Sequence, residues 1–367
     1  MLSFTPTEEQ QMLVDAITRY AVNDVRKIAH EADETGALPA DVLRKGWEIG
    51  LLPALVPESH GGLGEYSAVT NVLAAEAFAY GDLALAMAVM APGLIGIPVL
   101  FSGTEEQQRN ILPALADEKA PGFTAGLIEP GIAFDPYAPR TTARRENGFY
   151  ILDGAKCYVP LAETARLILV YARDSESGQV DGYLVEAGAV GLVISEREKL
   201  MGVRALPTHT LTLSGVKVGA GCKLGGEQPT AFKRIMSHSQ VAIAAMAVGV
   251  ARGAFEYARQ YAKERVQFGV PIATKQAIAF MLAEMAIEVD AARLMTWEAA
   301  WKLDTQPDAD HTPEARLAKD YADQAALFVT DCAVQVLGGH GYIREHPVER
   351  WLRNARGFVT FDGMAII

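Results

Sequence analysis

Cysteine and long apolar segments are scarce in this sequence. Its three cysteines, Cys157, Cys222 and Cys332, are far apart, which excludes a disulfide framework and the close cysteine pairs of a structural metal site. No run of apolar residues reaches the roughly 18 residues that span a bilayer. Met1 leads into a polar helix start rather than a secretory signal peptide. We therefore expect a cytoplasmic protein that holds no metal ion and has no membrane span.

Basic residues are in the minority. Lys and Arg number 33 against 45 Asp and Glu, which gives a formal net charge of −12 at pH 7. Nucleic acids and anionic membrane surfaces bind clustered Lys and Arg, so neither is expected as a partner. Common catalytic and nucleotide-binding motifs are also missing: there is no P-loop, no GxGxxG after a strand, no HExxH and no GxSxG.

The 367 residues are half apolar, which is enough for a large core and for two or three structural units. The periodicity changes twice along the chain. It is helical in residues 1–118, is replaced by short β-rich runs in 119–228, and is helical again in 229–367. We predict an α+β protein with an all-helical N-terminal domain, a small antiparallel β-barrel in the middle and a C-terminal four-helix bundle, with those boundaries.

Capping patterns locate several helix starts. Thr5 is predicted as the N-cap of the first helix, with Glu8 closing a capping box. Thr104–Gln107 repeats the capping-box pattern before a short helix. Between them, residues 66–101 are apolar on most faces, which is typical of a helix buried on nearly every side.

Six short runs in the middle region are predicted strands because they are β-rich and bounded by Gly, Asp, Asn or Pro. The runs are Phe123–Ile128, Gly148–Leu152, Leu167–Tyr171, Gly182–Val185, Gly191–Ile194 and Thr210–Leu213. So many short strands within about a hundred residues favour a small barrel or sandwich.

The C-terminal region places an acid in a sharp turn. After the run Gln335–Tyr342 and the segment PVERWLRNAR, the chain turns at Asp362-Gly363. Glycine allows a positive φ, so such a pair can present one carboxylate into a cleft, although the same dipeptide is common in ordinary surface turns. His340 and His346 lie nearby and are interpreted as solvated or packed histidines.

The order QVLGGHGY, PVERWLRNAR and acid-glycine resembles the C-terminal signature of the acyl-CoA dehydrogenase family, and the resemblance runs from end to end of the chain. In that family a glutamate removes the α-proton of an acyl-CoA thioester while the β-hydride passes to FAD. Asp362 stands at the glutamate position and Gly363 follows it. The side chain is one methylene shorter, which would withdraw its oxygen by roughly 1.5 Å, and a misplacement of that order slows chemistry about a hundredfold.

A second block, RxxFGxPIxxxQ, follows a long predicted helix. A guanidinium at such a helix end can form paired hydrogen bonds with a pyrophosphate. The resemblance implies that this block and the LGG stretch reach across a subunit interface to the neighbour's FAD. The matching residues are Arg265, Phe268, Gln276, Gln335, Gly338 and Gly339.

The loops that would face the chain's own flavin depart from the family pattern. Tyr158 matches an aromatic that stacks beside the flavin. Five other positions carry apolar residues where the family has hydroxyl or polar groups: Ile128, Phe134, Pro160, Met364 and Ile366. Proline also lacks a backbone donor.

These residues are compatible with three different functions. The first is an FAD-dependent acyl-CoA dehydrogenase with Asp362 as base and an electron-transfer flavoprotein as electron acceptor. The second is a partner subunit that completes another subunit's flavin site through Arg265, Phe268 and Gln335. The third is a redox-neutral enzyme or binding protein for a CoA thioester. Because the flavin would lie between subunits, the resemblance implies a homo- or heterotetramer in each case.

Overall fold

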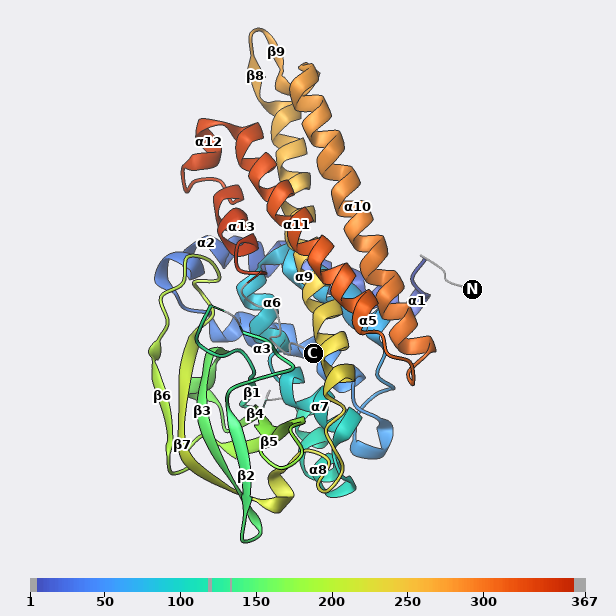
Figure 1. Ribbon diagram of the computed structural model, residues 1–367. Helices are drawn as coiled ribbons and strands as arrows, with labels where there is room; N and C mark the ends of the chain where they lie inside the picture. Colours follow the sequence, from blue (N-terminus) through green and yellow to red (C-terminus); the bar gives the residue numbers. More distant parts are fainter. Residues whose placement is uncertain (1–4, 118–120, 133, 360–367) are drawn as a thin grey trace.

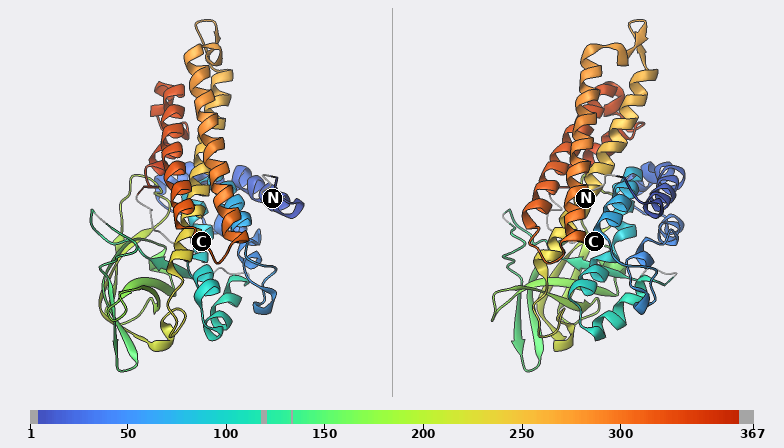
Figure 2. Two further views of the ribbon diagram at one scale, coloured as in Figure 1. Left: turned by 45° about the vertical axis from the view of Figure 1, so that its right-hand side comes forward. Right: turned by 90° about the vertical axis from the view of Figure 1, so that its right-hand side faces the viewer.

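A computed structural model describes residues 5–117, 121–132 and 134–359 of the protein. A curled sheet lies at one end, a group of N-terminal helices lies beside it, and long C-terminal helices extend away from both (Figure 1). The two further views show that these long helices project well beyond the rest of the molecule (Figure 2). The predicted order of helices, sheet and helices is confirmed, while the predicted boundaries after residues 118 and 228 stay predictions.

The N-terminal part is helical throughout. Its helices are α1 (Glu8–Tyr20), α2 (Arg26–Thr35), α3 (Ala40–Glu48), α4 (Leu51–Ala54), α5 (Ala68–Gly81), α6 (Leu83–Met90), α7 (Gly93–Ser102) and α8 (Glu105–Ile111), with one π-helical turn at Ala21–Val25. The predicted start of the first helix is wrong by two residues. Thr7 is the N-cap, and its capping partner is Gln10, because these two side chains bond each other's backbone amides at 3.2 and 3.0 Å. The capping box of Thr104 and Gln107 is confirmed.

Residues 66–101 form three helices rather than one. Asp82 interrupts the first of them in extended conformation, and its carboxylate accepts hydrogen bonds from the amides of Ala84 and Leu85. An aspartate that caps a new helix competes with continuation of the old one. The second break falls at Ala91-Pro92, just before α7. Both new helices are almost completely buried, as the apolar pattern predicts.

The middle part is one seven-stranded sheet. Its strands are β1 (Phe123–Gly126), β2 (Thr142–Glu146), β3 (Phe149–Pro160), β4 (Leu167–Asp174), β5 (Val180–Glu186), β6 (Leu192–Arg197) and β7 (Thr208–Gly219). β4 pairs with β5 along one edge and with β1 and β2 along the other, and the sheet continues through β3 and β7 to β6. The pairs of β4 with β1 and with β2 are parallel, and the others are antiparallel.

This sheet is curled but does not close into a barrel among the described strands, since β1, β5 and β6 each pair with a single neighbour. The fold class is confirmed with this qualification. Strand β2 was not predicted because its sequence, TARRE, is mostly charged and exposed. It is held by pairing with β3 rather than by its own β propensity.

The C-terminal part consists of α9 (Phe232–Glu264), α10 (Gln276–Thr305), α11 (Thr312–Leu337), α12 (Gly339–Tyr342) and α13 (Val348–Ala355). A two-stranded hairpin, β8 (Val266–Gln267) and β9 (Val270–Pro271), joins α9 to α10 at the far tip of the bundle. The fourth helix of the bundle, α13, is short.

Helix α9 is long and apolar enough to cross a membrane by a test that tolerates up to two charged residues, although no uninterrupted apolar run within it reaches 18 residues. Its apolar window is 78% buried within the molecule, however. It packs against α5, α10 and α11, which explains the apolar composition as that of a core helix. The bent pair α6 and α7 passes the same length and composition test only if taken as one span.

Candidate functional site

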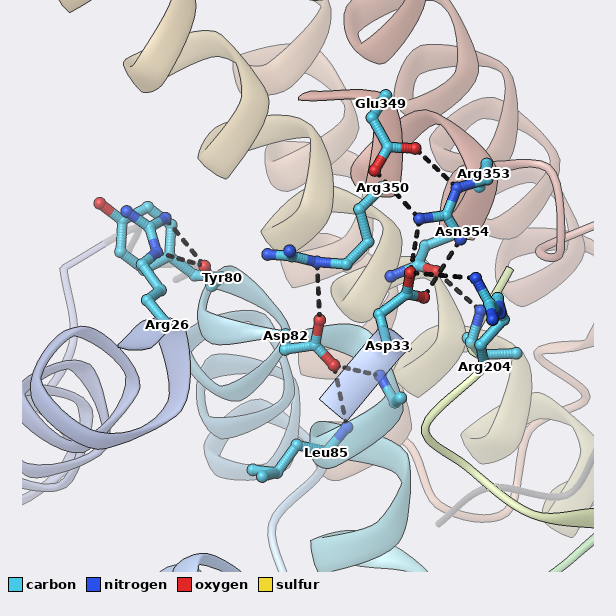
Figure 3. A network of polar contacts seen from close by, with 12 residues as sticks. Arg26, Asp33, Tyr80, Asp82, Leu85, Arg204, Glu349, Arg350, Arg353 and Asn354 are labelled. Carbon is cyan, nitrogen blue, oxygen red and sulfur yellow. Dashed lines mark hydrogen bonds and ion pairs between the residues drawn. The ribbon is translucent and has the colours of Figure 1, made fainter. Parts of the chain in front are cut away.

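Helix α13, which leads into the predicted acid-glycine turn, is fixed by ion pairs to the N-terminal helices (Figure 3). The buried carboxylate of Asp33 accepts hydrogen bonds from Arg353 at 2.7 and 3.1 Å and from Arg344 at 2.8 Å, and Arg204 lies 3.8 Å away. Burial favours a higher pKa for Asp33, but the neighbouring guanidiniums outweigh it and lower the pKa below its usual range. This carboxylate is therefore charged at neutral pH.

Two further contacts hold α13 in place, and another ion pair lies within the helix (Figure 3). The Arg353 guanidinium also donates to Glu349, one turn earlier, at 2.7 Å. Arg350 lies 3.5 Å from the buried Asp82 carboxylate, the same group that caps α6. The Asn354 side chain accepts the amide hydrogen of Val203 at 2.7 Å. The end of α13 is thus tied to α2, to α6 and to the loop that precedes β7.

A small cavity of about 210 Å³ lies where this loop meets α13. It is lined by Tyr158, Leu200, Met201, Gly202, Val203, Arg353, Arg356 and Gly357. Tyr158 has φ +56° and sits in a bulge of β3 between Lys156 and Val159. Its amide donates to the Glu198 carboxylate at 3.2 Å rather than to the neighbouring strand. A non-glycine residue in the left-handed region is costly and is held by its surroundings, so the bulge presents this aromatic ring at the cavity.

A buried ion pair supports the same part of the sheet. Lys156 is fully buried, and its ammonium donates to Glu129 at 2.9 Å and to the Leu127 carbonyl at 3.1 Å. Glu129 also accepts the amide hydrogens of Arg140 and Thr141, each at 2.7 Å. Burial alone would raise the pKa of Glu129, but Lys156 and Thr141 lower it to about 2. Sequence analysis did not predict this pair, because the two residues are 27 positions apart and no local pattern connects them.

Two of the positions that would face the chain's own flavin are buried, and their carbonyls are hydrogen-bonded within the protein. Ile128 is buried, and its carbonyl accepts the Cys157 amide hydrogen at 2.9 Å. Pro160 is also buried, and its carbonyl accepts the Thr124 hydroxyl at 2.5 Å. This threonine hydroxyl is therefore already hydrogen-bonded within the protein. Phe134 is partly buried against the core.

The residues predicted to serve a neighbour's flavin lie at the opposite end of the molecule. Phe268 is 91% exposed at the tip of the hairpin, with φ +56°. Arg265 is exposed at the end of α9, and its guanidinium has no ion-pair or hydrogen-bond partner among the described residues. At Gly338, where φ is +59°, and at Gly339, an added Cβ would meet no atom within 4 Å. Gln276 begins α10 and Gln335 lies on the last turn of α11, both exposed.

Figure 1 shows that the hairpin tip and strand β3 are at opposite ends of the protein. One chain therefore does not bring Phe268 and Tyr158 together. The catalytic candidate Asp362 and its neighbour Gly363, together with Met364 and Ile366, lie outside the described residues.

Comparison with known proteins identifies the family. The N-terminal, middle and C-terminal domain models of acyl-CoA dehydrogenase match residues 7–119, 100–216 and 230–365. A probable acyl-CoA dehydrogenase of Bacillus subtilis is 35% identical over all of this chain and 97% of its own length. The chain belongs to the acyl-CoA dehydrogenase family.

Two other proteins extend the comparison. A subunit of the caffeyl-CoA reductase–Etf complex of Acetobacterium woodii is 33% identical over 97% of this chain and 95% of its own length. The butyryl-CoA dehydrogenase structure from Megasphaera elsdenii aligns with a TM-score of 0.89 at 30% identity, covering 99% of this chain and 97% of that one. The predicted family, fold and enzyme class, an oxidoreductase acting on CH–CH bonds, are confirmed, and so is a flavin as the cofactor type.

The described residues offer more polar contacts for a flavin at the hairpin end of the molecule than at the sheet end. At the hairpin end, an unpaired guanidinium, an exposed aromatic ring and open glycines offer groups that a nucleotide can contact. At the sheet end, Tyr158 offers a ring for stacking, but the side chains of Ile128 and Pro160 offer no hydrogen-bond donor. Polar contacts to a flavin there would fall to backbone groups.

Proposed function

We propose that this member of the acyl-CoA dehydrogenase family is an FAD-dependent desaturase of an acyl-CoA thioester. The observation that supports it most is the full-length family match combined with the exposed Phe268 and the exposed, unpaired guanidinium of Arg265 at the far tip of the bundle. The Lys275 ammonium lies 5.7 Å from the centre of the exposed Phe268 ring, and neither Phe268 nor Arg265 is buried in the core. Contact with a cofactor in a neighbouring protomer would account for both residues at this position.

The chemistry assigns a separate task to each group of residues. Bound FAD supplies the acceptor for the hydride that leaves the β-carbon. In this proposal the Asp362 carboxylate takes the α-proton, so that the Cα–H and Cβ–H bonds break and a carbon–carbon double bond forms. The ion pairs of Asp33 with Arg353 fix the helix that leads to Asp362. Tyr158, which lines the cavity at the sheet end, would stack beside the flavin ring.

We propose that the assembly is a tetramer. The outer face of α10 exposes Phe280, Ile287 and Leu294 at seven-residue spacing, and α11 exposes Leu317 and Phe328. Apolar residues repeating every seven positions form a continuous stripe on a helix, which is suited to packing against another helix. Flavin sites shared between protomers would then depend on this contact. We place the protein in the cytoplasm, with an electron-transfer flavoprotein as electron acceptor, in keeping with the relative that belongs to an Etf complex.

A second function has its own support. The buried Ile128 and Pro160 at the sheet end provide no side-chain donors that would hold the chain's own flavin. The hairpin end, by contrast, carries the exposed Arg265 and Phe268. This asymmetry favours a partner subunit, which would complete the flavin site of a second, catalytic family member.

Flavin content distinguishes the two functions. The full chain would be purified alone and its FAD counted per protomer by absorbance. About one FAD per chain, reduced by a panel of acyl-CoA thioesters in the wild type but not in Asp362→Ala, would establish the desaturase. The Asp331→Ala variant, which removes an exposed acid of α11, is the matched control and keeps wild-type reduction.

A colourless protein that gains flavin only with a second family member would instead establish the partner subunit. Flavin that is bound but not reduced by any thioester would contradict both functions and leave a redox-neutral CoA-thioester protein.

A further inference from the structure

Two residues beside α13 hold a backbone conformation that is rare for any residue but glycine. Among the described residues, five that are not glycine have a positive φ, and two of them, Tyr158 at +56° and Val203 at +45°, line the same cavity of about 210 Å³. A left-handed backbone brings Cβ too close to the following carbonyl oxygen, and for a β-branched residue such as valine it is a clear outlier. Strain of this kind persists only where the surroundings impose it, and it is concentrated at functional sites. This cavity wall is therefore built at a cost in free energy.

Val203 is held in its conformation by a side chain of α13. Its amide donates to Oδ1 of Asn354 at 2.7 Å, and its carbonyl accepts the amide hydrogen of Leu206 at 2.9 Å. Val203 and Asn354 are each only 2% exposed, so water does not replace these contacts. Rotation of φ to an extended value would move the amide or the carbonyl of Val203 away from its partner and leave a buried polar group unpaired. The hydrogen bond to Asn354 therefore offsets the strain.

The two residues that precede Val203 are fixed to the same helix. The Arg353 guanidinium donates to the Met201 carbonyl at 3.0 Å. A Cβ at Gly202 would lie 2.3 Å from the Arg353 carbonyl oxygen, so the loop packs directly on the backbone of α13 and only glycine fits there. Arg353 and Asn354 lie next to each other near the end of α13 (Figure 3). Helix α13 thus holds three consecutive residues of this loop.

The start of the same loop holds Tyr158. Glu198 directly follows β6, and both oxygens of its carboxylate lie 3.2 Å from the Tyr158 amide nitrogen, which donates to them. Each of the two strained residues thus gives its amide hydrogen to a side-chain oxygen. The segment 198–203 connects the contact at Tyr158 with the one that Asn354 makes.

We propose that Asn354 is a positioning residue for the flavin. By holding Val203 it fixes the segment 198–203, and this segment keeps the Tyr158 ring at the cavity, where it meets the flavin. The inference rests on the proposed function, because it takes Tyr158 to lie beside a bound flavin. Asp362, the proposed base, follows Asn354 by eight positions in the sequence. One short helix therefore supports the ring and precedes the residue that carries the base.

Hydrogen exchange tests this connection in the full-length protein without added ligand. Mass spectrometry would follow peptides that cover residues 155–160 and 198–206. In Asn354→Ala both should exchange about tenfold faster than in wild type, because the loop loses the hydrogen bond that holds its strained residue. Asn354→Asp keeps the accepting oxygen and should stay close to wild type. Asn110→Ala, which changes an exposed asparagine of α8, is the matched control.

A second variant tests the strain itself. Glycine adopts a positive φ without penalty, so in Val203→Gly the loop needs no hydrogen bond to keep its conformation. Asn354→Ala should therefore change exchange by a much smaller factor in the Val203→Gly background than in the wild-type background. A role of Asn354 in the packing of α13 alone would give equal effects in both backgrounds.

Bound flavin reports on the same contact. An aromatic ring stacked on a flavin quenches its fluorescence, so FAD bound to Asn354→Ala should fluoresce more brightly than FAD bound to wild type. The kcat for the thioester should fall about tenfold while KM stays unchanged, because displacement of a group beside the reacting ring affects the chemical step rather than substrate binding. Both changes should be smaller in the double variant with Val203→Gly.

The outcomes decide the inference separately from the function. Wild-type exchange of residues 155–160 in Asn354→Ala would overturn the inference, and so would equal effects of this change in the two backgrounds. Faster exchange with unchanged flavin fluorescence would overturn the link to the flavin. Should no form bind flavin, the proposed function fails, while exchange still decides whether Asn354 holds Tyr158. Thermal unfolding checks that each variant is folded; if Asn354→Ala is not, Asn354→Ser, which shortens the side chain, replaces it in every measurement.

Discussion

At the scale of single residues, the pair of Glu129 and Lys156 shows how a buried charge fixes a loop. The ammonium of Lys156 is fully enclosed, and the carboxylate accepts two backbone amide hydrogens as well as the ion pair. Removing one partner of such a pair leaves the other charge buried without compensation. The loop that starts at Leu127 therefore depends on both residues.

This arrangement predicts a specific dependence of stability on pH. The pKa of Glu129 is lowered from 4.5 to about 2 by folding, so its contribution is present above pH 4.5 and is lost as pH falls toward 2. Glu129→Gln should cost about 3–5 kcal/mol in the free energy of unfolding at pH 7. Urea unfolding at several pH values should show wild type and variant converging in acid. Glu146→Gln, in an exposed surface pair with Arg144, should change stability by about 0–1 kcal/mol; a similar cost for both variants would contradict the role of burial.

At the scale of secondary-structure elements, the position of α13 depends on one aspartate of α2. Asp33 meets guanidiniums from α13 and from the loop before β7 (Figure 3). It also meets the guanidinium of Arg344, in the loop before α13. Helix α13 is only eight residues long, too short to be stable by itself in water. Its orientation is therefore set by these contacts and by its packing against α9 and α11.

The variant Asp33→Asn tests this contact. It removes the charge but keeps the size, and it should lower the free energy of unfolding by about 1–3 kcal/mol because several guanidiniums lose their counter-charge. The neighbouring Glu34→Gln affects only an exposed pair with Arg344 and should cost less than about 1 kcal/mol. Chemical unfolding of both variants supplies the comparison. Equal effects would show that α13 is held by packing alone.

At the scale of the whole molecule, the two ends of the folded protein carry residues for different parts of one flavin site. The sheet end has a stacking aromatic, and the hairpin end has the exposed Arg265 and Phe268. Because these ends are far apart in one chain, a site that uses both requires a second chain. The stripe of Phe280, Ile287 and Leu294 on α10 is the surface that we propose for that contact.

Disrupting the stripe should dissociate the assembly. Ile287→Glu places a charge on a surface that is buried if the tetramer forms, so light scattering after gel filtration should show a smaller species than wild type. Flavin content should fall with it. Val190→Glu, at a position 92% exposed on the sheet domain, is the control and should leave the assembly unchanged. A tetramer that survives Ile287→Glu would exclude this face of α10 as the interface.

Much of the architecture follows from local sequence. Helix α9 and the capping box of Thr104 and Gln107 are recognisable because apolar periodicity and caps act within a few residues. Six of the seven strands of the sheet were found for the same reason. Strand β2 was not, because its charged residues are held by the neighbouring strand, and the breaks at Asp82 and Pro92 were missed within a uniformly apolar stretch.

The sequence by itself determined the family, the order of helices and sheet, and the residues that match the flavin-binding blocks, because these depend on short motifs and their spacing. Only the tertiary structure decided which distant residues meet. Glu129 with Lys156, Asp33 with Arg353, and Asn354 with Val203 come together through packing of elements that no local pattern connects. Their electrostatics depend on burial and on distances of a few ångströms, which are properties of the folded chain.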